Sequence, residues 1–176
     1  MRRAASLVAA PLRLAAAALV AAALPACDHF PGATSDLERG EAALKRRDYP
    51  EAVARFTETL KADPKDARAY LGRGQARLSL NDAVGAVNDL TEAIRLGPRP
   101  VEAYRARSTA YAALGKPDPA IGDCTAAIRL DPTAADLYYA RAHLYKSQGR
   151  GEQAQADFRE ATRLDAAYKN SRETFR

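Results

Sequence analysis

The chain has 176 residues, with 27 lysines and arginines, 22 aspartates and glutamates, and a formal net charge of +5. Three of the basic residues lie within the first 26 positions, so the remainder carries 24 basic and 22 acidic residues and is nearly neutral. A nearly neutral chain lacks the basic surface with which proteins bind nucleic acid, and we expect no nucleic-acid partner.

Residues 1–26 have the layout of a secretory signal peptide. Arg2, Arg3 and Arg13 occur there without an acidic residue, and an apolar stretch follows over residues 14–24. This stretch is shorter than the roughly 20 apolar residues that span a bilayer. A basic start, a short apolar segment and small residues at its end are typical of export signals. We therefore expect a signal helix that precedes the mature chain.

The letters LPAC at residues 24–27 indicate how this signal is processed. They resemble the lipobox of bacterial lipoproteins, and the resemblance implies that Cys27 receives lipid as the first residue of the mature chain. Residues 27–34 are then the lipidated cysteine and a flexible tether, with a reach of roughly 15 Å. We expect a lipid anchor in the cell membrane, on the periplasmic or extracytoplasmic side. The alternative is cleavage near Ala23, which leaves a soluble periplasmic or secreted protein.

Residues 33–168 divide without a gap into four segments of 34 residues: 33–66, 67–100, 101–134 and 135–168. Three positions show the repeat most clearly. Position 20 holds Ala52, Ala86, Ala120 and Ala154; position 24 holds Phe56, Leu90, Cys124 and Phe158; position 32 holds Pro64, Pro98 and Pro132. A fixed period of this length indicates a repeat architecture. The four segments resemble tetratricopeptide repeats (TPRs).

Each segment contains two apolar-periodic stretches of helical length, separated by turn-forming residues. These breaks are RRDYP (46–50), LND (80–82), LGKPDP (114–119) and QGRG (148–151). A single hairpin cannot bury its apolar face alone, so stacked hairpins share one core. We expect an all-α fold, a right-handed α-solenoid of four TPR helix hairpins. Residues 169–176 would form a short polar tail or a partial cap.

An arginine recurs at position 7 of every segment, in Arg39, Arg73, Arg107 and Arg141. In the last three segments an aspartate follows 16 residues later, on the second helix. A guanidinium and a carboxylate pair readily in a bidentate way, so we expect the structural ion pairs Arg73–Asp89, Arg107–Asp123 and Arg141–Asp157. In the first segment Arg39 instead faces Arg55. The alternative is a row of arginines that binds an acidic or phosphorylated ligand.

The resemblance to TPR proteins also implies a concave groove lined by the first helix of each repeat. Twelve residues at the corresponding positions are candidates for partner binding: Leu37, Glu41, Leu44, Arg68, Leu71, Gln75, Leu78, Arg105, Thr109, Tyr139, His143 and Lys146. The groove begins with four leucines and becomes polar towards its end. Such a surface suits a peptide or a helix with apolar anchors at one end.

Two features limit what this groove is expected to do. The Lys and Asn residues with which some TPR domains grip chaperone tails are missing from the matching positions, so chaperone-tail binding is not expected. The leucines could also pack against the N-terminal segment or against a second copy of the chain, which would make the protein a homo-oligomer.

Chemistry-bearing residues are sparse. His29 and His143 stand apart, and the sequence has no catalytic triad, zinc-ligand spacing or phosphate-binding glycine loop. We expect no enzyme activity, cofactor, metal or disulfide, and a buried filler role for Cys124. The sequence thus favours a non-enzymatic scaffold or adaptor of the bacterial cell envelope that binds a peptide or helix of an envelope protein. The alternative is a self-associating structural lipoprotein or pilotin-like assembly factor, joined through its leucine patch and open C-terminal end.

Overall fold

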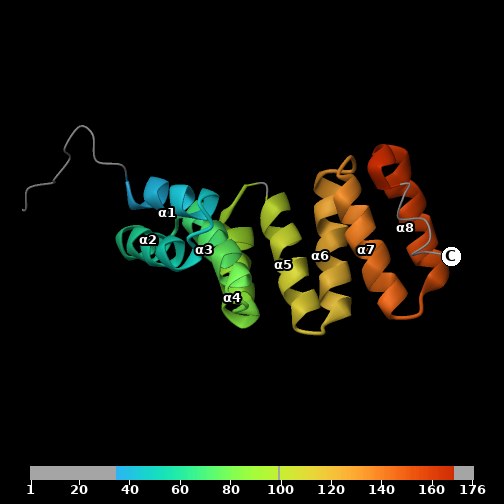
Figure 1. Cartoon of the computed structure of the whole chain (residues 1–176), viewed down its shortest axis with the longest axis horizontal. Coiled ribbons are helices and arrows are strands. Elements are labelled where there is room, and N and C mark those ends of the chain that lie inside the picture. Colours follow the sequence, from blue (N-terminus) through green and yellow to red (C-terminus); the bar gives the residue numbers. More distant parts are fainter. Residues whose placement is uncertain (1–34, 99, 169–176) are drawn as a thin grey trace, which may run out of the picture. The chain divides into compact units, whose positions relative to one another are not determined.

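Eight α-helices form the part of the chain that the computed structural model describes, residues 35–98 and 100–168, and no strand occurs in that part (Figure 1). They are α1 (Asp36–Lys45), α2 (Tyr49–Ala62), α3 (Ala67–Ser79), α4 (Ala83–Leu96), α5 (Val101–Ala113), α6 (Pro117–Leu130), α7 (Ala135–Ser147) and α8 (Gly151–Leu164). Each pair of helices falls within one 34-residue segment. The all-α fold of stacked hairpins expected from the sequence is therefore confirmed. The predicted signal peptide (1–26), the predicted tether (27–34) and the predicted tail or partial cap (169–176) lie outside the described residues.

Polar and proline residues set where the helices begin. Ser35 caps α1 in a capping box, in which its hydroxyl accepts from the Glu38 amide and the Glu38 carboxylate accepts from the Ser35 amide. An aspartate caps each of α2, α3 and α4 with a side-chain hydrogen bond, as is usual at this position. The α6 helix starts at Pro117, where a missing N–H costs little because that group has no partner within the helix.

The turn inside each hairpin uses a left-handed backbone at the same repeat position. Arg47, Asn81, Gly115 and Gly149 have φ angles of 61°, 62°, 67° and 72°. Glycine and asparagine adopt this conformation readily, whereas an arginine is uncommon there. The four breaks found in the sequence inside the hairpins therefore share one turn geometry.

The core is built from a large side chain on the second helix of a repeat and small residues on the first helices beside it. Phe56 on α2 is fully buried, and a Cβ added at Gly40 on α1 would lie 2.8 Å from its ring. A Cβ at Gly72 on α3 would meet the same ring even more closely. In the next repeat a Cβ at Gly74 would lie 2.7 Å from Leu90 Cγ. Glycine is therefore required where these helices approach most closely.

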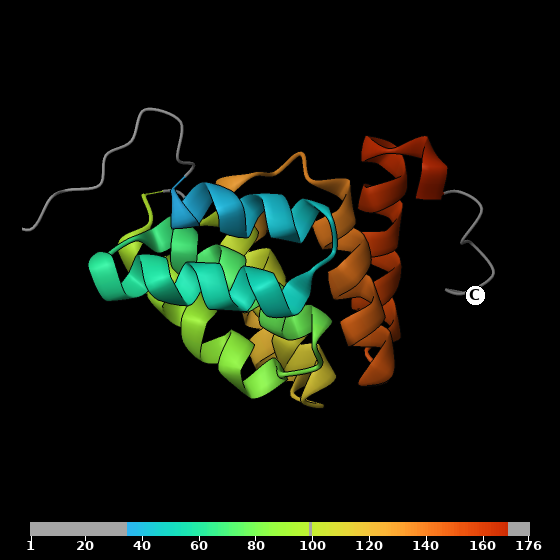
Figure 2. The same ribbon diagram turned by 60° about the vertical axis from the view of Figure 1, so that its left-hand side comes forward.

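The first helices α1, α3 and α5 contact one another in succession, and an ion pair between Arg105 and Asp136 links α5 to α7. Each helix packs against the helices before and after it, and α1 also contacts α3 as α3 contacts α5 (Figures 1 and 2). The whole described part belongs to one compact unit. Within it, no helix is both long and apolar enough to cross a membrane.

Candidate interaction surface and polar ladder

The four leucines predicted for the groove lie on the first-helix face but are partly buried. Leu37 and Leu44 pack against the core cluster around Phe56, while Leu71 and Leu78 pack against the cluster around Leu90. None of them is among the exposed large apolar residues of the described part, which are Leu80, Val84 and Leu130. Because most of each leucine side chain packs against the core, only a small apolar area of each is accessible to a partner.

Ion pairs join neighbouring first helices across this face. Arg68 on α3 donates to Glu41 on α1 at 2.6 Å. Arg105 on α5 lies 3.2 Å from Asp136 on α7, and the buried Nε of Arg105 has no hydrogen-bond partner among the described residues. Two of the predicted groove residues thus pair with each other, and a third pairs with Asp136.

An aromatic group closes the C-terminal end of the face. The ring of Tyr139 on α7 lies 4.6 Å from that of His143, 6.4 Å from Phe158 and 4.7 Å from Tyr168. Tyr168 belongs to the short turn at 166–168 that follows α8, so this turn covers part of the α7 surface. Partial desolvation, together with the positive charge of Lys146, lowers the pKa of His143, although this side chain is still largely exposed. Partial desolvation likewise raises the pKa of Tyr168.

The remaining predicted groove residues differ in how much they present to solvent. Arg68, Thr109, His143 and Lys146 are exposed, whereas Gln75 is half-buried. The Thr109 hydroxyl donates to the Arg105 carbonyl of its own helix. The candidates therefore include three groups along the face: partly buried leucines, charged pairs, and an aromatic end with Tyr139 and His143.

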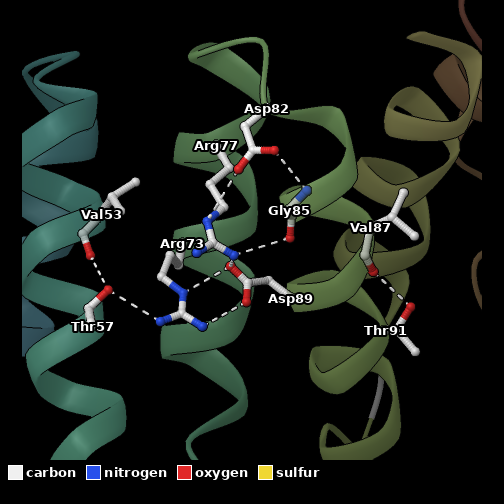
Figure 3. Close-up of polar contacts among 9 residues, drawn as sticks. All are labelled: Val53, Thr57, Arg73, Arg77, Asp82, Gly85, Val87, Asp89 and Thr91. Atoms are coloured by element: carbon white, nitrogen blue, oxygen red, sulfur yellow. Dashed lines mark hydrogen bonds and ion pairs between the residues drawn. The ribbon is translucent and has the colours of Figure 1, made fainter. Parts of the chain in front are cut away.

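The position-7 arginines of the last three repeats form a ladder of ion pairs with buried aspartates. Arg73 donates from Nε and Nη2 to the two carboxylate oxygens of Asp89, at 2.9 and 2.8 Å (Figure 3). Arg107–Asp123 has the same geometry at 2.8 and 2.7 Å, and Arg141–Asp157 at 2.7 and 2.8 Å. The three aspartates are only 3%, 5% and 7% exposed. These side chains hold the two helices of each hairpin together and are not presented to a ligand.

Each of these arginines also reaches back to the preceding repeat. The remaining Nη1 group of Arg73 donates to the Thr57 hydroxyl at 3.2 Å, and that hydroxyl donates to the Val53 carbonyl (Figure 3). The equivalent bonds are Arg107 to Thr91 and Arg141 to Thr125, both at 2.9 Å. These threonines were not predicted from the sequence, although all three stand at position 25 of their repeats, where the 34-residue spacing marks them.

Tyrosines complete the ladder. The guanidinium carbons of Arg73, Arg107 and Arg141 each lie 5.7 Å from the ring centre of the tyrosine three residues earlier: Tyr70, Tyr104 and Tyr138. This is the distance range of cation–π contacts. Asp89 also accepts a hydrogen bond from Arg77 at 2.8 Å. Arg77 stands at position 11 of its repeat, where the later repeats have a second tyrosine, Tyr111 or Tyr145, near the ladder arginine.

The first repeat departs from this pattern at positions 4 and 23, and position 23 holds Arg55 in place of an aspartate. Asp36 stands at position 4, where the other repeats have tyrosine, and it lies 3.8 Å from Arg39 and 3.3 Å from Arg55. Arg55 also donates to Glu51 at 2.7 Å. Arg39 therefore does not offer an unpaired charge to a partner, because the missing position-23 acid is replaced by an acid from position 4.

The chemically reactive side chains of the described part are few. Cys124 is fully buried, and this burial raises the pKa of its thiol, as expected of a packing residue. In residues 35–98 and 100–168, no group of three histidine, cysteine or acidic side chains is placed to hold a metal ion.

Comparisons with known proteins agree with this architecture. Models described as tetratricopeptide repeat match residues 37–90, 85–135 and 135–168. The chain belongs to the tetratricopeptide repeat family. Comparison with curated proteins found no match.

Several solved structures share the fold. MamA superposes with a TM-score of 0.74 at 21% identity, over 80% of this chain and 76% of that one. The TPR domain of Arabidopsis OM64 is 32% identical, with a TM-score of 0.62 over 63% of this chain and 92% of that chain. YrrB, described as a TPR protein with an unusual peptide-binding site, has a TM-score of 0.67 at 18% identity, over 74% and 68% of the two chains. At this level of identity, MamA and YrrB show likeness of fold alone.

Proposed function

We propose that this protein is a non-enzymatic interaction module that binds a peptide or helix of a partner protein on the first-helix face. The observation that supports the proposal is that two sets of side chains have different roles, one inside the repeats and one at the surface. The arginines and aspartates of the ladder pair with each other inside the repeats. Arg68, Thr109 and Lys146 on the first helices are instead exposed to solvent. The peptide-binding site ascribed to YrrB supports this use of the fold.

The composition of the face suggests the chemistry of the partner segment. Its α1–α3 end presents the outer surfaces of four leucines around the Glu41–Arg68 pair. Its α5–α7 end presents hydroxyl, imidazole and ammonium groups. A segment with aliphatic side chains at one end and polar or acidic side chains at the other fits both.

We further propose that the module works at the outer side of a bacterial membrane, anchored by lipid on Cys27, with an envelope protein as its partner. The support is the LPAC stretch that ends an export-type signal. A diacyl- or triacylglyceryl mass on Cys27, together with loss of membrane association in Cys27→Ser, is the expected result. An unlipidated chain in the soluble fraction would favour the alternative of a soluble periplasmic or secreted protein.

Site-specific photo-cross-linking in the native host tests the binding face. A photoreactive residue at Gln75 or Thr109 should capture one partner, while the same residue at Asn88, exposed on α4, should not. Because Arg68 and Lys146 supply exposed positive charge, Arg68→Glu with Lys146→Glu should reduce capture at Thr109. Equal capture at Asn88 would contradict binding at this face. Cross-links between two copies of this chain would instead indicate self-association through the leucines.

A further inference from the structure

The turns inside the hairpins lie along one edge of the array, and the connections between hairpins lie along the other, because successive helices alternate in direction. Neighbouring turns are in contact: Gln148 Nε2 donates to Asp118 Oδ1 of the preceding turn at 2.6 Å. These two residues stand at positions 14 and 18 of their repeats. Where the first turn meets the second, and the second meets the third, the same two positions hold only apolar residues: Pro50, Leu80, Val84 and Leu114.

Apolar side chains are unusually exposed at the second of these turns. Val84 is 60% exposed and Leu80 is 44% exposed, and they stand four residues apart on the two sides of the α3–α4 turn. Pro50 beside them is also exposed. Leu130, the other exposed large apolar residue of the described part, stands alone at the opposite edge. Single exposed apolar residues are ordinary, whereas a group of them rimmed by polar residues marks an interaction site.

Uncompensated positive charge lies at the first turn. Lys45, Arg46 and Arg47 follow one another and are all exposed. None of their side chains forms an ion pair or a hydrogen bond with another residue of the described part. The neighbouring acids are already engaged, because Asp48 caps α2 and the Glu51 carboxylate accepts from an arginine of its own helix. The charge of the three basic side chains is therefore available to a partner.

Arg47 is also an unfavourable residue for the backbone conformation that it adopts. Its φ angle is 61°, and the other repeats hold Asn81, Gly115 or Gly149 at this position. Glycine reaches this conformation without strain, whereas an arginine does not. The turn itself gains nothing from an arginine, so the use of this residue lies in what its side chain contacts. Backbone strain of this kind is found where a residue serves binding.

We propose that this edge of the first two repeats is a second interaction surface, which binds an acidic segment with aliphatic side chains on a partner protein. The surface, named the turn-edge patch, consists of Lys45, Arg46, Arg47, Pro50, Leu80 and Val84. Carboxylates of the segment pair with the basic side chains, and its aliphatic residues cover Leu80 and Val84. The patch is distinct from the first-helix face, so this inference goes beyond the proposed function.

The position of the patch favours a protein over a membrane surface. The α1 helix begins at Asp36, on the edge where hairpins connect, and ends at the turn that carries the patch. With the proposed lipid anchor on Cys27, the tether joins the edge opposite the patch. The length of α1, 10 residues or roughly 15 Å, then separates the patch from the anchored edge.

Photo-cross-linking of the full chain in the native host tests this proposal. A photoreactive residue at Leu80 should capture one partner protein, and mass spectrometry of the cross-linked peptide should identify an acidic segment with aliphatic residues. Arg46→Glu with Arg47→Glu should reduce this capture several-fold, because both charges then repel the acids. Arg129→Glu is the matched control, since Arg129 is exposed at the opposite edge and has no ion pair within the described part. A photoreactive residue at Leu130 controls for non-specific capture.

Arg47→Gly separates binding from folding. Glycine is the residue of the third and fourth repeats at this position, so the Tm of the variant should be no lower than that of the wild-type chain. Capture at Leu80 should nevertheless fall several-fold. Capture that is unchanged both in Arg47→Gly and in the double charge reversal would overturn the proposal.

The other occupants of the patch are distinguishable outcomes. No capture at Leu80, capture of a second copy of this chain, or capture of a segment without acidic residues would each contradict the proposal. Flotation of the purified chain with phosphatidylglycerol vesicles, lost in Leu80→Ser with Val84→Ser, would identify a membrane and overturn it as well.

Failure of this inference can be told apart from failure of the proposed function. Capture at Thr109 without capture at Leu80 would leave binding at the first-helix face intact and refute the turn-edge patch. Capture at Leu80 alone would do the reverse. Asn88, further along α4 and away from the turns, lies outside the patch and remains a control for both surfaces.

Discussion

Removal of Asp123 should destabilise the protein strongly, whereas removal of its whole ion pair should not. Asp123 is 5% exposed and accepts two hydrogen bonds from Arg107, whose side chain is 16% exposed. Asp123→Leu leaves that guanidinium buried without an acid, and breaking a buried pair in this way costs about 3–5 kcal/mol. For a chain of this size, about 4 kcal/mol corresponds to a Tm lower by roughly 12 °C.

The double variant Arg107→Leu/Asp123→Leu distinguishes two quantities: the free-energy cost of an unpaired buried charge, and the net contribution of the ion pair to the free energy of unfolding. Replacing both partners by apolar residues is often neutral or stabilising, since neither charge then has to lose its water. We therefore expect the double variant to recover most of the lost Tm in thermal unfolding followed by circular dichroism. Asp36→Leu, at a solvent-exposed pair of the first repeat, should change Tm little. A double variant as unstable as the single one would refute this reasoning and show that the pair itself holds the hairpin together.

Three further outcomes follow from the structure. Gly72→Ala should cost about 1–3 kcal/mol in urea unfolding because its Cβ meets Phe56, and adding Phe56→Leu should recover part of that loss; no loss would contradict the close packing. Ser35→Ala removes the capping box and should cost about 1 kcal/mol, with faster amide exchange at Glu38 as the local measurement and unchanged exchange as the contrary result. Burial raises the pKa of Cys124, so the unfolded chain should lose its thiol proton first; stability should then fall as pH rises above about 8.5, and Cys124→Ala should lack this part of the decline.

Most of the fold could be predicted from the 34-residue periodicity of the sequence. The 34-residue register placed two helices in every segment, and the breaks LND and QGRG fall where α3 gives way to α4 and α7 to α8. The 16-residue spacing from Arg107 to Asp123 also sufficed to relate those side chains, because it joins two helices of one hairpin. Within a hairpin, a short turn and the helical pitch determine which residues meet.

Contacts between different repeats could not be derived in the same way. Whether Leu71 faces solvent or the core, and whether Arg68 meets Glu41, depends on the angle at which one hairpin packs on the next. That angle is set by the side chains that fill each junction, such as Phe56 against Gly72, and not by the repeat period.

The repeat, its helices and the ion pairs inside each hairpin therefore follow from the sequence alone, because they depend on residues close together along the chain. The packing of one hairpin on the next sets which first-helix side chains remain exposed and brings Thr57 to the arginine of the following repeat. The tertiary structure also showed that Asp36 replaces the missing acid beside Arg39 and Arg55, since that substitution requires three side chains from two helices to converge in space.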